Sequence, residues 1–360
     1  MMKVLLDGLM VGSGSGGDMR YIMDLAAEMS KSKNFEPIMA ILPHGEQILK
    51  ASELSYIKLS GLRVEGPVLL HRAAKKVKPQ IIHTQYFPVP FFGGNVVTTI
   101  HDVGFLKFPQ SYSHYQRIKL RTASRLALKT SDAIVTVSNF SYRHLVELYP
   151  KYKSKIVVVP NGVDLDKYTI ATSTSRKPYI LWVGNTEPRK NFQNLLEAYQ
   201  IVKRRWADLQ LIAAGKIPSI NKNELEALGG KSVGFLNDHD LMQLISNSVG
   251  IVYPSLFEGF GLPPLEALAC GRPSVVHYTL PLLDYVRKGL VAVDGHRTIE
   301  LAEGILELKL GNWDSSALRN EARKLSIVES STRLMALYEK VLDRSQTVVK
   351  TDTGQFANPR

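Results

Sequence analysis

The sequence predicts an α/β protein made of two similar domains, each built on a mainly parallel sheet. Its 360 residues suit two domains of about 100–200 residues. Short apolar runs alternate along the chain with segments whose apolar residues recur at helical spacing. This alternation favours parallel strands covered by helices on both faces. Between the halves, Leu165–Pro178 is polar and poor in apolar residues, which is typical of an interdomain linker.

The elements follow the same order in both halves. In the first half, strands are expected at Lys3–Leu9, Pro37–Leu42, Gln80–His83, Val96–Ile100, Ile134–Val137 and Ile156–Val159, and helices at Gly17–Lys31, Val68–Lys78 and Gln116–Lys129. In the second half, strands are expected at Tyr179–Val183, Leu209–Ala213, Gly250–Tyr253, Ser274–Val276 and Leu290–Val293, and helices at Asn191–Trp206, Asp238–Asn247, Pro264–Ala269 and Ile299–Lys309. We therefore expect a first domain over residues 1–168, a linker over 169–177, a second domain over 178–328 and a loose tail over 346–360.

Composition narrows the class of protein. A hydrophobic share of 44% and a charged share of 22% are ordinary for a globular protein. The single cysteine, Cys270, excludes a disulfide framework and a cysteine-rich zinc module. No run approaches the ~18 apolar residues of a membrane span, and the apolar start lacks a basic leader, so we expect a cytoplasmic protein. The formal charge of +12 suggests an anionic partner, but no nucleic-acid recognition motif accompanies it.

Open parallel sheets bind ligands beyond the carboxyl ends of their strands, and two such domains in tandem place the site in the cleft between them. A glycine-rich loop follows the first strand, with Gly12, Gly14, Ser15, Gly16 and Gly17. We interpret it as a loop that receives a substrate, because bare backbone and a helix N-terminus allow close approach by an anion. A flexible turn is one alternative. A GxGxxG dinucleotide loop with Glu36 as the ribose acid is another.

His101 and Asp102 come directly after a predicted strand. A histidine at a strand end can donate a hydrogen bond to a sugar hydroxyl or a phosphate, and it can take either charge state near neutral pH. Asp102 could orient the imidazole. The alternative is a satisfied polar pair that closes the strand.

The first strand of the second domain ends in a loop that carries two cations. Arg189 and Lys190 lie at the expected start of a helix, where the helix dipole also favours anions. A planar guanidinium and a compact ammonium together suit a diphosphate. The alternative is a solvated basic pair. Gly184, earlier in the loop, would permit close approach.

The segment Glu258–Glu266 is the most specific of these motifs. Gly259 and Gly261 keep the backbone bare, and a proline follows that suits a first helical turn. We expect Glu258 in the loop and Glu266 in the first turn of the helix, with both carboxylates facing the cleft. Each carboxylate could accept hydrogen bonds from two sugar hydroxyls. The alternative for Glu266 is a charge that only stabilises its helix.

The first half of the chain holds most of the excess charge. Residues 1–165 contain 21 basic and 12 acidic side chains, so their formal charge is +9. Four of these cations recur at every fourth position along one face of the helix expected at Gln116–Lys129, namely Arg117, Arg121, Arg125 and Lys129. This face could dock on anionic lipid or on a phosphorylated acceptor, or it could simply be solvated.

Together these motifs resemble those of retaining glycosyltransferases of family 4, which have the GT-B fold of two Rossmann-like domains around a cleft. The likeness covers nearly all of residues 1–345. It rests most on Pro254–Ala267, which has two glutamates with seven residues between them, and on Gly184–Asn191. Supporting matches are His101–Asp102, Val137–Ser141 and Pro160–Asp164.

The resemblance implies a role for each residue. The groups that it places at the reaction are His101, Arg189, Lys190 and Glu258. Donor-binding positions are Gly184, Asn185, Arg189 and Lys190 for the diphosphate, Glu266 for the ribose, Phe235 and Leu236 in the base-binding segment, and Phe260, Gly261 and Leu262 near the sugar. The loop from Gly14 through Ser15 and Gly16 to Gly17 would close on donor and acceptor. Asp102 would lie on the acceptor side. A helix over 329–345 would cross back to the first domain.

The activity implied by the resemblance is transfer of a hexose from a nucleoside-diphosphate sugar to a hydroxyl of a glycan or a lipid-linked acceptor, with retained configuration. The donor would be GDP-mannose or a UDP-sugar, without a metal or other cofactor. Peripheral contact with the cytoplasmic face of an anionic membrane is a further expectation. Two alternatives stay open, an NAD-dependent oxidoreductase using Gly12–Gly17 and a catalytically inactive scaffold. Leu282 departs from the family pattern, which usually has an acid there.

Overall fold

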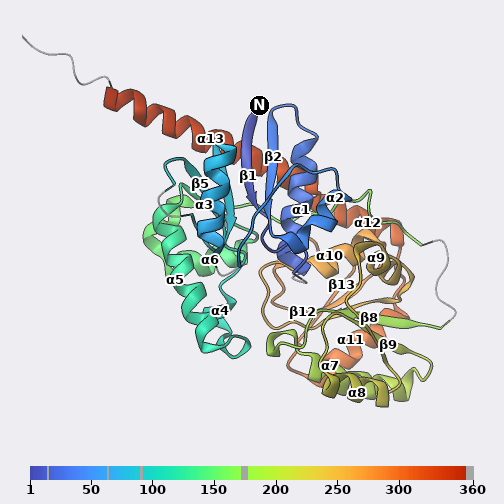
Figure 1. Cartoon of the computed structure of the whole chain (residues 1–360). Coiled ribbons are helices and arrows are strands. Elements are labelled where there is room, and N and C mark those ends of the chain that lie inside the picture. The colour runs from blue at the N-terminus through green and yellow to red at the C-terminus, as the bar shows by residue number, and fades with distance from the viewer. Residues whose placement is uncertain (14–15, 63–64, 90–91, 172–176, 354–360) are drawn as a thin grey trace, which may run out of the picture.

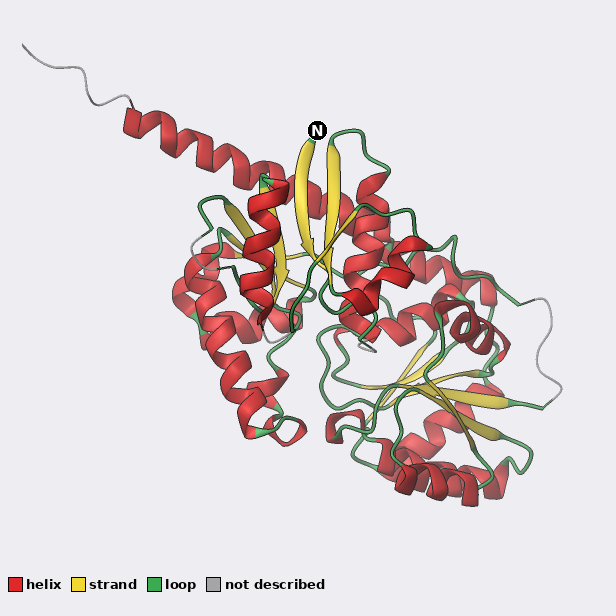
Figure 2. Ribbon diagram, in the orientation of Figure 1, coloured by secondary structure: helices red, strands yellow, loops and turns green. Residues whose placement is uncertain are grey.

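The computed structural model describes residues 1–13, 16–62, 65–89, 92–171 and 177–353, and for residues 346–353 it describes the backbone alone. In this part of the chain the strands form two parallel sheets, each flanked by helices (Figure 1, Figure 2). The first sheet has seven strands in the order β3-β2-β1-β4-β5-β6-β7, and the second has six in the order β10-β9-β8-β11-β12-β13. The prediction of two Rossmann-like α/β domains is confirmed.

The elements have the following bounds. The first sheet comprises β1 Met2–Asp7, β2 Phe35–Ile41, β3 Tyr56–Lys58, β4 Ile81–Gln85, β5 Asn95–Thr99, β6 Ala133–Thr136 and β7 Ile156–Val158. The second comprises β8 Tyr179–Val183, β9 Gln210–Ala214, β10 Lys231–Gly234, β11 Gly250–Tyr253, β12 Ser274–His277 and β13 Leu290–Val293. The helices are α1 Gly16–Ser30, α2 Glu46–Lys50, α3 Gly66–Val77, α4 Gly104–Lys107, α5 His114–Thr130, α6 Asn139–Leu148, α7 Phe192–Arg205, α8 Ser219–Ala227, α9 Asp238–Asn247, α10 Leu262–Ala269, α11 Thr298–Leu310, α12 Ser315–Ala322 and α13 Ile327–Thr353, with short 3-10 turns η3 Pro109–Ser111 and η5 Pro188–Lys190.

Strands such as β1 are apolar at consecutive positions because helices cover both faces of the sheet. Val4 and Leu6 belong to a buried cluster that includes Ile22 of α1. Leu5, between them, belongs to a different cluster that includes Leu69 of α3. Successive side chains of a strand point to opposite faces, so α1 and α3 lie on opposite sides of the first sheet.

Several elements were not predicted from the sequence. These are β3, β10, α6, α8 and α12, together with the short α2 and α4. β3 is only three residues long and forms by pairing with β2, where Tyr56 lies opposite Met39. α6 begins at an N-cap serine, Ser138, whose hydroxyl accepts a hydrogen bond from the backbone N–H of Ser141 at 3.0 Å.

Helix α13 carries the end of the chain across the first domain (Figure 1). It contacts α1 and β5. Near its start, Ser326 forms a bridge with Val163, and the Ser330 hydroxyl donates a hydrogen bond to the carbonyl of Pro160 at 2.6 Å. The helix continues to Thr353, so residues 346–353 extend it where a loose tail was expected. A helix once begun gains one backbone hydrogen bond for each added residue, which favours this extension.

The crossing depends on a glycine with no room for a side chain. A β carbon at Gly162 would lie 2.4 Å from the carbonyl oxygen of Ser326. We therefore expect Gly162→Ala to lower the free energy of unfolding by about 1–3 kcal/mol, measured by chemical denaturation. The control is Gly93→Ala, because a β carbon there meets no described atom within 4 Å. Equal stability of the two variants would contradict the prediction.

Candidate functional site

The two domains meet at loops that follow the carboxyl ends of their strands. A β carbon at Gly259, in the loop after β11, would lie 2.6 Å from the carbonyl oxygen of His101, which follows β5. The Ser141 hydroxyl lies 2.9 Å from this carbonyl oxygen and 3.4 Å from that of Gly259. The backbone N–H of Arg189 donates to Ser111 Oγ at 2.9 Å. Candidate residues of both domains therefore border one interdomain boundary.

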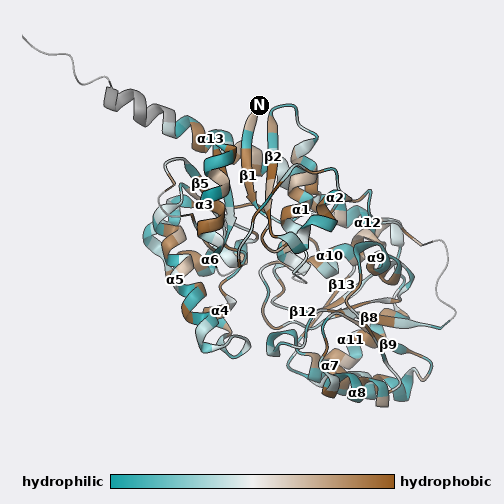
Figure 3. Ribbon diagram, in the orientation of Figure 1, coloured by the Kyte–Doolittle hydropathy of each residue, from teal (hydrophilic) through white to brown (hydrophobic). Residues whose placement is uncertain are grey.

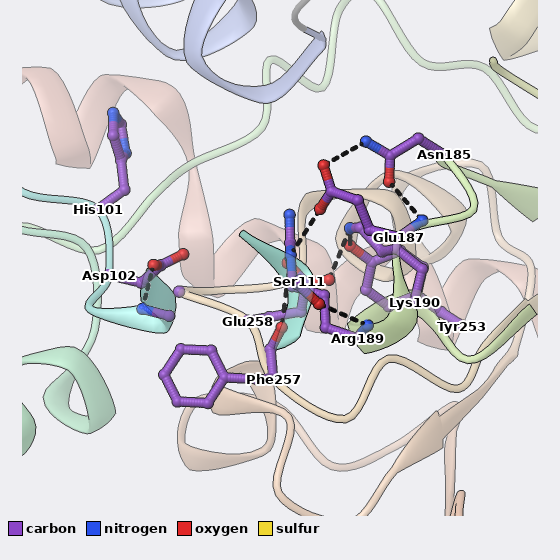
Figure 4. Close-up of polar contacts among 12 residues, drawn as sticks. His101, Asp102, Ser111, Asn185, Glu187, Arg189, Lys190, Tyr253, Phe257 and Glu258 are labelled. Atoms are coloured by element: carbon purple, nitrogen blue, oxygen red, sulfur yellow. Dashed lines mark hydrogen bonds and ion pairs between the residues drawn. The ribbon is translucent and has the colours of Figure 1, made fainter. Parts of the chain in front are cut away.

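A buried carboxylate joins the two predicted cations of the second domain (Figure 4). Lys190 Nζ donates to Glu258 Oε1 at 2.6 Å, and Arg189 Nη1 donates to Glu258 Oε2 at 3.0 Å. Lys190 Nζ also donates to the Tyr253 hydroxyl at 2.8 Å and lies 4.9 Å from the centre of the Tyr253 ring. The side chains of Lys190, Arg189 and Glu258 are only 12%, 16% and 10% exposed.

Burial and mutual attraction oppose each other in this cluster. Burial alone would raise the pKa of Glu258, but the charges of Lys190 and Arg189 outweigh it and lower that pKa to about 2. Burial lowers the pKa of Lys190, and Glu258 offsets part of that effect. For Arg189 burial acts downward, but Glu258 and Asp102 raise its pKa well above the ordinary value. Glu258 therefore stays ionised at neutral pH.

A second carboxylate, that of Glu187 in the same loop, also binds the Arg189 guanidinium. Glu187 Oε2 accepts from Arg189 Nε at 3.0 Å, and Glu187 Oε1 accepts from Asn185 Nδ2 at 2.8 Å. Gly215 packs closely against this loop, and the sequence motifs did not point to it. Its φ is +127°, and a β carbon there would lie 1.8 Å from the Gly184 carbonyl oxygen.

His101 is held by a residue that the sequence analysis did not identify. Its Nε2 lies 2.8 Å from Gln85 Oε1, while Gln85 Nε2 donates to the Asp7 carbonyl at 3.3 Å. The Gln85 oxygen is thus the acceptor, so His101 Nε2 carries a proton and the neutral ring has Nδ1 as an acceptor. Asp18 Oδ1 of α1 lies 3.8 Å from the same Nε2.

Asp102 does not orient the imidazole, contrary to expectation. Its Oδ1 instead accepts from the backbone N–H of Gly104 at 2.7 Å, at the start of α4 (Figure 4). The Asp102 carboxylate thereby caps the first turn of α4, two residues further along the chain. This contact directs the carboxylate away from the His101 ring.

Glu266 lies in the second turn of α10, not the first, because the helix already begins at Leu262. Its side chain is 1% exposed and pairs across the domain boundary with Arg20 of α1, through Arg20 Nη1 and Glu266 Oε1. Arg20 Nη2 also donates to Asp238 Oδ1 at 2.7 Å. The two glutamates of the motif therefore hold different cations, and Arg20 was missed from the sequence.

The glycine-rich loop divides into two parts. Gly12 has φ +79° and a β carbon there would lie 2.5 Å from the His44 carbonyl oxygen, so it packs against protein. Apart from their chain neighbours and the backbone of their own helix, no described atom lies within 4 Å of a β carbon placed at Gly16 or Gly17. Gly14 and Ser15 lie outside the described residues. Glu36 of β2 lies opposite Lys3 of β1 in the strand register, near the amino ends of both strands. The ribose of a dinucleotide would bind at the other edge of the sheet, beyond the carboxyl ends.

The base-binding candidates follow β10. The Phe235 ring is 60% exposed, while Leu236 packs partly against the main core. Phe260 is buried, and its carbonyl accepts from the backbone N–H of Leu282 at 3.1 Å. Leu282 is fully buried, so its apolar side chain fills core space at the position where an acid is usual. Gly261 has φ +114°, which suits glycine at the start of α10.

The basic face of α5 lies on the surface. Arg117, Arg121, Arg125 and Lys129 are all exposed, and Tyr115 and Ile118 among them are 67% and 54% exposed. Figure 3 shows hydrophilic and hydrophobic residues mixed along this helix. The helix packs inward through small and apolar residues, including Ala123, Ala127 and Leu128.

The described residues contain neither a candidate metal site nor a helix suited to span a membrane. No cluster of three or more His, Cys, Asp or Glu side chains there could hold a metal ion. The triplet Asp238–Asp240 has the Asp-x-Asp pattern, but Asp238 binds Arg20 and Asp240 accepts from the Asn237 amide at 2.8 Å. None of the described helices has both the length and the apolarity of a membrane span.

Comparisons with known proteins match both halves of the chain. Residues 15–167 match the family model for Glycosyltransferase Family 4, and residues 169–325 match the model for glycosyl transferases group 1. The chain is a glycosyltransferase of the family 4 type. The O-antigen chain mannosyltransferase B of Escherichia coli is 27% identical, and the alignment covers 82% of this glycosyltransferase and 92% of the relative.

Solved structures agree with the GT-B fold of the glycosyltransferase. A glycosyltransferase from Rickettsia africae ESF-5 superposes with a TM-score of 0.72 at 21% identity, covering 95% of this chain and 98% of the other. Anabaena HepE, solved in complex with UDP and glucose, superposes with a TM-score of 0.75 at 16% identity, covering 94% and 100%. Neither the comparisons nor the geometry supports the oxidoreductase alternative.

Some functional candidates of the glycosyltransferase could have been found in the sequence. Arg20 leaves no clear signal, because it lies in the second turn of α1, beyond the reach of the helix dipole. Gln85 ends a strand whose last three residues are polar yet buried. Gly215 leaves no such signal, because its need for glycine arises from contact with the Gly184 carbonyl.

The stability lost on removing the shared carboxylate should depend on pH. The folded-state pKa of Glu258 is about 2, below the ordinary 4.5, so its ionised form stabilises the fold above about pH 4.5 and that contribution is lost as the pH falls toward 2. We expect Glu258→Gln to lower the free energy of unfolding at pH 7 by on the order of 3 kcal/mol. The difference from the unsubstituted protein should shrink below pH 4.5 in denaturation curves.

The control for this prediction is Glu187→Gln. Glu187 also binds Arg189 but is 36% exposed, so its loss should cost less than about 1 kcal/mol. A difference for Glu258→Gln that stays constant between pH 6 and pH 3 would contradict the assigned pKa.

Proposed function

We propose that this glycosyltransferase transfers a hexose from a nucleoside-diphosphate sugar to an acceptor hydroxyl, with retained configuration and without a metal. The observation that carries the proposal is the buried cluster in which Arg189 and Lys190 share Glu258 at the interdomain boundary. Arg189 also binds the partly exposed Glu187, so the four charges balance, and the cluster offers two fixed cationic hydrogen-bond donors rather than a net charge. Such a site suits the negative charge that develops on a leaving diphosphate.

The cluster supports stabilisation of the leaving group better than covalent catalysis by Glu258. Both oxygens of Glu258 accept hydrogen bonds from cations, and its pKa is about 2, so the carboxylate is a weak nucleophile. We therefore propose that the acceptor attacks from the face the diphosphate leaves, and that a leaving phosphate oxygen takes the acceptor proton. The new glycosidic bond forms as the bond to the diphosphate breaks.

The first domain would supply the acceptor side. His101 and Asp18 lie together near Gly16 and Gly17, on the opposite side of the boundary from Lys190. The relative named O-antigen chain mannosyltransferase B favours GDP-mannose as donor and a glycan or lipid-linked acceptor. HepE, solved with UDP and glucose, favours a UDP-sugar as the second candidate.

Loss of either cation should slow the reaction strongly. We expect Arg189→Ala and Lys190→Ala each to lower kcat/KM by about 10²–10³, because a buried group that stabilises the leaving charge is removed. Nucleoside-diphosphate release is measured with GDP-mannose and UDP-glucose, with and without EDTA. Arg205→Ala, an exposed pair partner of Glu303, is the control and should leave kcat/KM unchanged. Normal turnover in both test variants, or abolition by EDTA, would contradict the proposal.

We also propose that α5 holds the enzyme against an anionic membrane. Its exposed cations would attract acidic headgroups, while the exposed Tyr115 and Ile118 would enter the interface. The helix begins three residues after Ser111, which binds the Arg189 backbone, so the proposed membrane face starts beside the site. A lipid-linked acceptor would then lie within reach of the boundary.

Membrane binding through α5 should depend on its charges. We expect a variant with Gln at positions 117, 121, 125 and 129 to bind phosphatidylglycerol vesicles at least about 10-fold more weakly, because each cation near an anionic surface contributes roughly 1 kcal/mol. Co-sedimentation with phosphatidylcholine vesicles gives the background. The control replaces four exposed cations of the second domain by Gln, namely Arg204, Lys222, Lys231 and Lys288. Equal loss in both variants would mean that net charge alone causes binding.

A further inference from the structure

The ion pair of Arg20 joins the two domains through buried groups. Arg20 belongs to α1 of the first domain, but both of its carboxylate partners, Glu266 and Asp238, belong to the second. The side chain of Arg20 is 16% exposed and that of Glu266 is 1% exposed. Burial alone would lower the pKa of Arg20, yet Glu266 and Asp238 raise it well above the ordinary value, so Arg20 is a permanent cation here.

The two partners of Arg20 come from the elements that would bind the nucleoside. Glu266 is the expected ribose ligand, and Asp238 ends the segment Gly234–Asp238 expected to bind the base. A single guanidinium thus spans both elements from the opposite domain. Its planar fork suits this task, because each terminal nitrogen donates to a different carboxylate.

Glu266 has an unused hydrogen-bond acceptor. Its Oε1 accepts from Arg20, whereas its Oε2 is buried and has no hydrogen-bond partner among the described residues. A buried carboxylate oxygen without a donor is destabilising, and a hydroxyl of a ligand would relieve that cost. Without Arg20, the same carboxylate would lose the cation that it binds, and a buried charge without a partner is destabilising.

We propose that Arg20 is a positioning residue that holds the Glu266 carboxylate in place, so that Glu266 Oε2 accepts a hydrogen bond from a ribose hydroxyl of the donor. Arg20 acts through Glu266 and does not itself touch the ribose. Nucleotide binding thereby depends on contact between the two domains. This inference rests on the proposed function, since it assumes that a nucleoside diphosphate occupies the cleft.

Binding of ligands that contain or lack the ribose hydroxyls tests the proposal. The probes in titration calorimetry are GDP and UDP, their 2′,3′-dideoxy forms, and inorganic pyrophosphate. We expect Arg20→Ala to weaken binding of the preferred nucleoside diphosphate roughly 10- to 100-fold, as for a lost charged hydrogen bond. Arg20→Lys keeps the charge without the fork and should lie between. The affinity for pyrophosphate should not change. The dideoxy nucleotide should bind Arg20→Ala and the unsubstituted protein almost equally.

The matched control is Arg143→Ala. Arg143 forms another interdomain ion pair, with Asp284 at 3.5 Å, but its side chain is 64% exposed. This variant should bind every probe as the unsubstituted protein does. Circular dichroism checks that each variant is folded. If Arg20→Ala does not fold, the test is made with Arg20→Lys alone.

The outcomes separate this inference from the proposed function. If the unsubstituted protein binds pyrophosphate and neither nucleotide, or none of the probes, the proposed function fails and the role of Arg20 fails with it. If nucleotides bind normally but Arg20→Ala and Arg20→Lys leave their affinity unchanged or increase it, only the role of Arg20 is overturned. An equal loss for pyrophosphate would also overturn it, because Arg20 would then act on the phosphates or on domain arrangement.

Discussion

One buried carboxylate shared by two cations is the constraint on which the site depends. Lys190 depends on Glu258 to remain charged, because burial lowers the pKa of Lys190 and the carboxylate that it binds opposes this effect. With Glu258 and the more exposed Glu187, the two cations are balanced by two carboxylates. The cationic donors are preorganised, since each side chain already has fixed hydrogen bonds before any ligand arrives.

The rest of the boundary serves to hold this cluster opposite the first domain. Gly259, next to Glu258, lies against the backbone of His101, and Ser141 contacts the carbonyls of both. Contacts between backbones define position more narrowly than contacts between long side chains, because they have few rotamers to exchange. The cation cluster and His101 are therefore placed relative to each other mainly by main-chain packing.

The fold was largely predictable because its signals are local. Buried parallel strands are apolar at most consecutive positions, and the strands of both sheets that matter for the site stood out for that reason. Elements such as β3 and α8 escaped, since β3 exists only through its pairing with β2 and α8 buries little more than Leu225.

The candidate site was predictable to the extent that its residues follow strands directly. Arg189, Lys190 and Glu258 do so, and the structure brings them together. Contacts that join distant segments were beyond reach, as for Gly215 with Gly184 or Arg20 with Glu266. Asp102 shows the opposite error, because its nearness to His101 in sequence suggested a contact that a local cap prevents.

The return of α13 to the first domain has a consequence for how the cleft can move. The chain passes between the domains twice, and at the bridge between Val163 and Ser326 the two passages run beside each other. The two backbone segments are therefore held together at this one place. A rotation of one domain about this point would leave the bridge intact, whereas sliding of one domain past the other would break its backbone hydrogen bonds.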